Sequence, residues 1–370
     1  MEICSREKCT GCMACAFVCP QKCIVTSEDE IGHYMPEIDK KKCIDCGACK
    51  RICPSLNAVE RSRPDKAFAA VSKDYNEYIT SSSGGVAAVM SRCTIENGGA
   101  VYGCTGTKGY DICYIRIDNP DELWRLKGSK YVESRTGDCY NEIKKDLSDG
   151  KQVLFIGTPC RAAAAKKLFG NNERFFVIDL ICHGVPPMRL LREHISSKIS
   201  DEPDEIKFRD GQDFTICAAR KGITLYKSQD LRDLYYTGFF KRLYFRKSCY
   251  SCQYANAERA GDLTIGDFWG VGKLNKITSA KEGLSVILVN TEKGKALLEN
   301  CKGAFEIEER SAEEAISGNA QLKRPSEKHK NTDKFRELYP KLGFKKAANR
   351  CLVINRIKYL ILSLYNKAKK

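Results

Sequence analysis

The chain has 370 residues, of which 42% are hydrophobic and 29% charged, as is ordinary for a soluble globular protein of about two or three domains. Its net charge of +15 is concentrated at the end: residues 321–370 carry 15 Lys and Arg against three acidic residues, a net +12. Residues 1–7 lack the apolar core of a signal peptide, and no apolar run approaches the roughly 20 residues of a membrane helix. We therefore expect a cytoplasmic protein, in which 21 cysteines indicate metal ligation rather than disulfides.

The head, residues 1–60, contains the pattern C-x₂-C-x₂-C-x₃-C-P twice. In two-cluster bacterial ferredoxins, three cysteines of each run and the fourth of the other run hold one [4Fe–4S] cluster. We predict one cluster on the first cysteine set, Cys9, Cys12, Cys15 and Cys53, and one on the second cysteine set, Cys43, Cys46, Cys49 and Cys19. Zinc sites or disulfides, the alternatives, give no reason for this duplicated spacing.

Between the two runs, residues 24–26 and 34–36 predict a short hairpin. Residues 60–66 are polar and contain Pro64, as expected of a linker. The body, residues 67–320, begins with a small-residue strand at 67–71, and strands are also expected at 100–103 and 112–117.

A Ser/Gly loop at residues 80–85 precedes a predicted helix at 86–93. The start of a helix is a natural anion site, because its free N–H groups and its dipole face the ligand. The alternative is an ordinary capped helix start.

Two apolar runs, residues 153–156 and 175–178, read as buried parallel strands separated by a helix at 161–169. Cys160 and Cys182 follow the carboxyl ends of these strands, the edge at which open α/β sheets bind ligands. The isolated pair Cys249 and Cys252 could complete a third cysteine set, for [4Fe–4S] or zinc, although a redox-active disulfide is the alternative for the pair. Residues 259–270 suggest a turn near a ligand.

The remainder predicts a strand at 285–289, a helix at 293–301 and a strand at 304–307. The overall prediction is an α+β protein: a two-cluster head, a mixed α/β body and a basic helical tail at residues 321–370. Apolar residues of the tail, Leu352, Val353, Ile354, Ile357, Leu360, Ile361 and Leu364, suggest an amphipathic helix. It would dock on the body or lie on a membrane surface.

The body resembles the coenzyme F420 hydrogenase/dehydrogenase beta subunit family. The resemblance rests on an ordered series of short motifs between residues 67 and 290. They are Ser83-Gly84-Gly85, Gly128-Ser129-Lys130-Tyr131, Gly157-Thr158-Pro159-Cys160, Cys182-His183-Gly184, Cys249-x₂-Cys252, and Ala260-Gly261-Asp262 through Gly266-Asp267-Phe268-Trp269-Gly270.

The resemblance implies FAD beside a [4Fe–4S] cluster held by the third cysteine set, with Ser83, Gly84, Gly85, Ser129, Lys130 and Tyr131 facing the flavin. Two features depart from the family. Arg161 stands where Gln often follows the cysteine, and the classical hydrogenase subunit lacks the two-cluster head.

These observations favour an iron–sulfur flavoprotein oxidoreductase that exchanges hydride with F420 or another small molecule. The alternatives are a non-catalytic electron-transfer subunit feeding a partner enzyme and a zinc-stabilised binding module. We expect a protein electron donor, acceptor or partner subunit, and no nucleic acid. No catalytic residue is assigned; His183 would either deliver protons or serve the structure.

Overall fold

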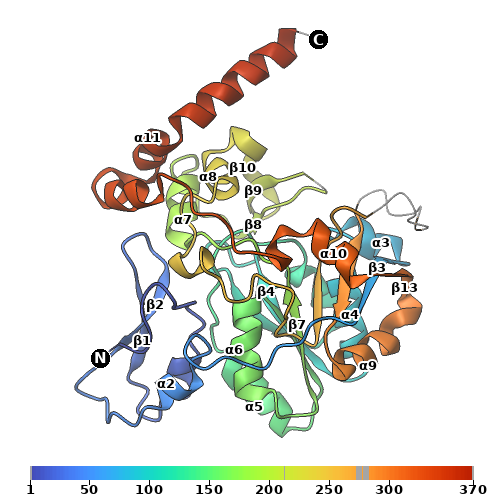
Figure 1. Ribbon diagram of the computed structural model, residues 1–370. Helices are drawn as coiled ribbons and strands as arrows, with labels where there is room; N and C mark the ends of the chain where they lie inside the picture. The colour runs from blue at the N-terminus through green and yellow to red at the C-terminus, as the bar shows by residue number, and fades with distance from the viewer. Residues whose placement is uncertain (1, 212, 272–276, 278–282, 369–370) are drawn as a thin grey trace.

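The computed structural model describes residues 2–211, 213–271, 277 and 283–368, with backbone alone for residues 230 and 353–368. The head lies on one side of a large mixed sheet covered by helices, and a smaller helical and β region carries the long carboxyl-terminal helix (Figure 1). The predicted α+β class is confirmed.

The head is built on two short helices and one hairpin. The elements are α1 (Ala14–Phe17), β1 (Ile24–Glu28), β2 (Tyr34–Ile38) and α2 (Ala48–Ile52). β1 pairs antiparallel with β2, as the hairpin prediction required. Each helix follows a residue with positive φ, Met13 (58°) or Gly47 (70°), so each cysteine run turns sharply into its helix.

The body is organised around an eight-stranded sheet of order β13-β3-β12-β11-β7-β6-β4-β5. The strands are β3 (Lys66–Ser72), β4 (Ala100–Thr105), β5 (Cys113–Ile117), β6 (Val153–Gly157), β7 (Phe175–Leu180), β11 (Leu263–Asp267), β12 (Ser285–Val289) and β13 (Phe305–Arg310). The central strands β4, β6, β7 and β11 are parallel, and the outer pairs are antiparallel. The carboxyl ends of four strands therefore meet at one edge.

Helices bury both faces of this sheet. On one face, α4 (Val86–Glu96) and α9 (Glu292–Cys301) cover side chains such as Leu154 and Ile178. On the other, α5 (Cys139–Ser148) and α6 (Pro159–Phe169) cover Val153 and Phe155. Alternate residues of β6 are thus buried on opposite faces, which explains why the strand is apolar throughout.

Further short elements complete the body. They are α3 (Tyr75–Ile79), α10 (Ala312–Gly318), η1 (Pro120–Leu126), η2 (Asp230–Arg232), η3 (Lys247–Cys249), η4 (Lys302–Ala304) and η5 (Ala320–Leu322). α3 and α10 contact β3 at its end of the sheet.

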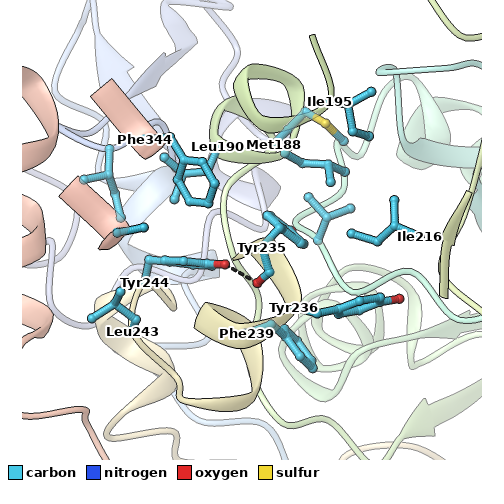
Figure 2. Close-up of a cluster of buried hydrophobic side chains, with 14 of the residues drawn as sticks. Met188, Leu190, Ile195, Ile216, Tyr235, Tyr236, Phe239, Leu243, Tyr244 and Phe344 are labelled. Carbon is cyan, nitrogen blue, oxygen red and sulfur yellow. Dashed lines mark hydrogen bonds between the residues drawn. The ribbon is translucent and has the colours of Figure 1, made fainter. Parts of the chain in front are cut away.

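A second sheet, absent from the sequence prediction, forms an aromatic core with nearby helices (Figure 2). The strands of this sheet are β8 (Glu205–Lys207), β9 (Thr215–Arg220) and β10 (Ile223–Gln229). The helices are α7 (Met188–Ser196), α8 (Leu234–Phe240) and α11 (Thr332–Ala368). Tyr235, Tyr236 and Tyr244 are completely buried, and their hydroxyls donate to the backbone carbonyls of Tyr131, Phe208 and Tyr235. Burial of these polar tips is therefore compensated by hydrogen bonds.

The first part of the tail packs on the body. α11 bends at Gly343 (φ 72°), and Phe335, Phe344 and Leu352 are buried in the aromatic core. The apolar tail positions from Val353 onward lie outside the described side chains, so their amphipathic role stays a prediction. In the described part of the chain, no helix has the length and apolarity needed to span a membrane.

Candidate iron–sulfur and cofactor site

The two crossed cysteine sets of the head line two separate hollows. The first hollow contains Cys9, Cys12, Cys15 and Cys53, joined by Cys4. The second contains Cys43, Cys46, Cys49 and Cys19, joined by Cys23, whose sulfur lies 3.4 Å from that of Cys19. Each set brings together three cysteines of one run and the fourth of the other, as the spacing predicts. The extra cysteine in each hollow was not anticipated.

These hollows suit a cluster because each cysteine of a cubane ligates a different iron, so the sulfurs surround a volume. Among the described residues, no three His, Cys, Asp or Glu side chains converge as a single metal ion would require. Burial raises the pKa of Cys12 to about 11, and a metal would have to displace that proton on binding. Ligation by these cysteines stays a prediction.

The third cysteine set also comes together. Cys160 and Cys182 follow the neighbouring parallel strands β6 and β7, and Cys249 and Cys252 lie close enough for the four thiols to influence one another electrostatically. Burial, reinforced by neighbouring thiols, raises the pKa of Cys182 to about 12 and of Cys252 to about 11. The thiols of Cys182 and Cys252 are therefore neutral at pH 7 unless a cationic centre stabilises their charged form.

Buried arginines of the body bind the backbone of the first cysteine run. The guanidinium of Arg161, next to Cys160, donates to the Gly11 carbonyl. The guanidinium of Arg246 donates to the carbonyls of Cys9 (3.3 Å) and Tyr34 (2.8 Å). A Cβ at Gly11 would lie 2.7 Å from both Arg246 Nη2 and the Tyr34 oxygen, so only glycine allows this approach.

Glu133 balances the charge at this interface. Its carboxylate accepts from Arg246, and its Oε2 lies 2.9 Å from His33 Nδ1 of the head. Burial alone would raise the pKa of Glu133, but Arg246 and His33 outweigh it and hold that pKa below its usual value. Glu133 is therefore ionised at neutral pH and is paired on both sides, as a buried charge requires.

A large cleft opens at the carboxyl ends of β4, β6, β7 and β11. We call it the cofactor cleft. Its wall is largely apolar and includes the start of α4, the segment from Leu126 to Ser134, and Cys160 and Cys182. Thr10 of the head, between Cys9 and Cys12, also reaches the cleft. The loop of the first cysteine run and two cysteines of the third set, Cys160 and Cys182, therefore line the same space.

The cleft fits a large cofactor that combines an aromatic ring with phosphate. Apolar side chains such as Ile156, Leu180 and Ile265 can cover a planar ring, and two helices begin at the wall. Val86, Ala87 and Ala88, the first turn of α4, line the cleft after Gly85 (φ 81°), which has no side chain to cap the helix. Their N–H groups are available to an anion.

Of the six residues expected to face a flavin, five line the cleft: Ser83, Gly85, Ser129, Lys130 and Tyr131. Gly84 instead packs on the sheet, where an added Cβ would lie 2.2 Å from the Ala70 carbonyl and 2.9 Å from the Ser285 nitrogen. Its role is to let the loop approach strands β3 and β12.

Lys130 is a buried cation on this wall. Its Nζ donates to the carbonyls of Leu126 (2.7 Å) and Lys127 (2.9 Å). Burial lowers the pKa of Lys130 to about 8, whereas the Cys104 thiol opposes this shift. The ammonium is thus easily neutralised unless an anion accompanies it.

His183 lines the same cleft, and burial, reinforced by Arg242, lowers its pKa to about 4. Its imidazole is therefore neutral at pH 7. Its backbone carbonyl accepts a hydrogen bond from Ser326 Oγ (2.6 Å), so the residue also anchors the beginning of the tail.

Residues 259–270, where the sequence suggests a turn near a ligand, have two roles: some stabilise the sheet and others line the cleft. Arg259 is buried against Asp179, with Nη2 2.7 Å from Oδ1, and the Gly261 N–H donates to Asp179 Oδ2. Asp262 accepts from the Val177 N–H at 2.9 Å. These residues hold β7 against β11, whereas Gly266 and Asp267 reach the cleft.

Comparison with known proteins agrees with this geometry. Residues 150–315 match the family model for the carboxyl terminus of the coenzyme F420 hydrogenase/dehydrogenase beta subunit, and residues 8–57 match that of a 4Fe-4S dicluster domain. Residues 150–315 thus carry the carboxyl-terminal domain of the coenzyme F420 hydrogenase/dehydrogenase beta subunit family. This match confirms the resemblance carried by the motifs of the body, and the match of the head confirms the predicted 4Fe-4S dicluster domain.

Among solved structures, the chain is similar to one in the F420-reducing [NiFe] hydrogenase complex from Methanosarcina barkeri. The two share 16% sequence identity with a TM-score of 0.49, and the similarity covers 70% of this chain and 92% of the other. A comparison with curated proteins gives no match.

Proposed function

We propose that this protein is an iron–sulfur flavoprotein oxidoreductase. The first, second and third cysteine sets would each hold a [4Fe–4S] cluster, and the cofactor cleft would hold FAD. When bound, these groups supply single-electron transfer and hydride exchange with a small acceptor, F420 or another molecule.

The observation that carries this proposal is the set of hydrogen bonds between the backbone of the head and residues next to the third cysteine set. Residues next to three cysteines of the third set bind the head's backbone: Arg161 donates to Gly11, Ser248 Oγ to the Cys9 carbonyl (3.1 Å) and Gln253 Nε2 to the Pro54 carbonyl (3.0 Å). Both sets are thereby held at one junction, which favours electron exchange between head and cleft. A head that served only as a structural module would not need this alignment.

The chain's own residues would bind and orient the cofactor. The first turn of α4 and Lys130 would bind phosphate, and the apolar wall would exclude water from the ring. Tyr131 packs against Phe239, which also lines the cleft, with ring centroids 5.0 Å apart, so the two rings fix each other's position in the wall.

The direct test is anaerobic purification followed by quantification of flavin, iron and acid-labile sulfide. We expect one FAD and about 12 iron atoms per chain, as three cubanes require. Assays should then follow hydride exchange with F420 and other small acceptors. Iron without flavin would favour the alternative electron-transfer subunit, and zinc without sulfide would contradict the proposal.

Retention of flavin should depend on pH through Lys130. Because burial places the pKa of Lys130 at about 8, its ammonium should bind phosphate fully below that pH, and affinity for FAD should fall as pH rises through it. Lys130→Met should weaken FAD binding about tenfold at pH 7, the loss of one charge-assisted hydrogen bond. It should also flatten the pH dependence, as measured by fluorescence titration of the apoprotein with FAD.

Lys127, nearby on the same wall but paired with Glu77 (Nζ–Oε2 3.1 Å), supplies the matched control. Lys127→Met should leave the alkaline decline in place. An unchanged decline in Lys130→Met would exclude Lys130 as its origin.

A further inference from the structure

The two cysteine sets of the head differ in exposure. Cys9, Cys12, Cys15 and Cys53 of the first set are all buried, and the body binds the backbone around them. In the second set, Cys46 is exposed and the other three are partly exposed. The second hollow is therefore the side of the head that meets solvent.

Exposed cations stand next to the cysteines of the second hollow in the chain, whereas Asp45 lines the hollow itself, and we call these cations the basic rim. Lys22 adjoins Cys23, Lys42 adjoins Cys43, Lys50 adjoins Cys49, and Arg51 Nη1 donates to the Cys46 carbonyl (2.8 Å). The exposed cations of this rim are Lys22, Lys40, Lys41, Lys42, Lys50 and Arg51. The acidic residues among them are Glu37, Asp39 and Asp45, of which Asp39 faces Lys42 (Oδ2–Nζ 3.8 Å). The rim thus keeps a net positive charge.

An apolar residue stands beside this rim. Ile44 lines the hollow between Cys43 and Cys46, and 61% of its surface is exposed. A large exposed aliphatic side chain beside exposed charges is typical of a small protein–protein interface. The aliphatic side chain gives the partner an apolar contact, and the charges orient the partner and speed its association.

We propose that the second hollow and its basic rim are the docking surface for an acidic one-electron carrier protein. This inference rests on the proposed function, because it identifies where electrons enter or leave the chain. The carrier is acidic because the rim is basic, and it is a protein because the exposed Ile44 offers an aliphatic contact beside the cations. A carrier bound there meets the most exposed cysteine of the head directly. Its encounter is governed by charge and is therefore weakened by salt.

The test measures Kd by isothermal titration calorimetry of the purified holoprotein with an oxidised, acidic bacterial-type ferredoxin. Because the carrier is oxidised, binding is measured without turnover. Lys41→Glu with Lys50→Glu should raise Kd about tenfold or more and reduce its salt dependence, since both lysines lie on the rim. Lys295→Glu with Lys302→Glu, an equal change of charge on α9 and its end, should leave Kd within about twofold.

Iron content and reduction of the clusters by dithionite show whether each variant is intact. If the glutamate pair disturbs the second cluster, Lys41→Gln with Lys50→Gln tests the same rim with a smaller change, and a smaller rise in Kd is expected. Equal Kd values for rim and control variants, or no binding of the unaltered protein, would overturn the proposal. Failure of the proposed function would appear separately, as missing flavin or iron in a protein that still binds the carrier.

Discussion

Cys249→Ala is expected to remove about four of about 12 iron atoms per chain and to abolish reduction of the flavin by a one-electron donor. Cys249 belongs to the third cysteine set, of which Cys160 and Cys182 line the cofactor cleft. Losing one of four ligands should release that cluster, whereas the eight cysteines of the first and second sets are untouched. Iron and sulfide analysis gives the first readout, and anaerobic stopped-flow absorbance of the flavin gives the second.

Cys217→Ala is the matched control, since Cys217 lies on β9 beside Thr224 (Sγ–Oγ1 3.8 Å). It should change neither iron content nor flavin reduction. Unchanged iron in Cys249→Ala would reject this residue as a ligand. Loss of iron with flavin reduction at the original rate would show a different route, in which the first cysteine set serves the cleft directly through the loop at Thr10.

Arg259→Met is expected to lower the free energy of unfolding by about 3–5 kcal/mol, because it leaves the buried carboxylate of Asp179 without its cation. The pair is almost completely buried, with 1% and 0% of the two side chains exposed. Arg259 also donates to the Tyr254 carbonyl (2.7 Å), two residues after Cys252. Urea unfolding under anaerobic conditions should show a midpoint lowered by about 1 M or more.

Lys295→Met breaks an exposed pair with Glu292 and provides the comparison, with 53% and 85% of the side chains exposed. Pairs of this kind contribute about 0.5 kcal/mol or less, so its midpoint should barely move. A loss in Arg259→Met as small as this would contradict the structural role assigned to the Asp179–Arg259 pair.

Local patterns were enough to predict most of the large sheet. The strands at 67–71, 153–156 and 285–289 are confirmed, because continuous apolar runs need burial on both faces. The second sheet was missed because β10 is largely exposed and mixes polar with apolar residues. No single window of such a sequence reveals a strand.

Within the site, cysteine spacing predicted which sulfurs the structure brings together, since spacing is a local property. The contacts between head and body were not predicted. Glu133 and Arg246, which pair there, are 113 residues apart, and in the sequence each alone resembles a surface charge. The extra cysteines Cys4 and Cys23 lie outside the repeated pattern and gave no signal. Gly84 appeared in a cofactor motif, but its contact with the sheet depends on residues far along the chain.

Because the head and the body share these contacts, the dicluster domain cannot be exchanged independently of the body. Cutting the chain after residue 60 would take away the carbonyl acceptors of Arg161 and Arg246 and the imidazole beside Glu133. It would also remove Phe17 from its edge contacts with Tyr140 (5.7 Å) and Phe169 (5.8 Å). Two guanidinium groups and an aromatic surface would be uncovered together. Recombination between relatives should therefore preserve head and body as a matched pair.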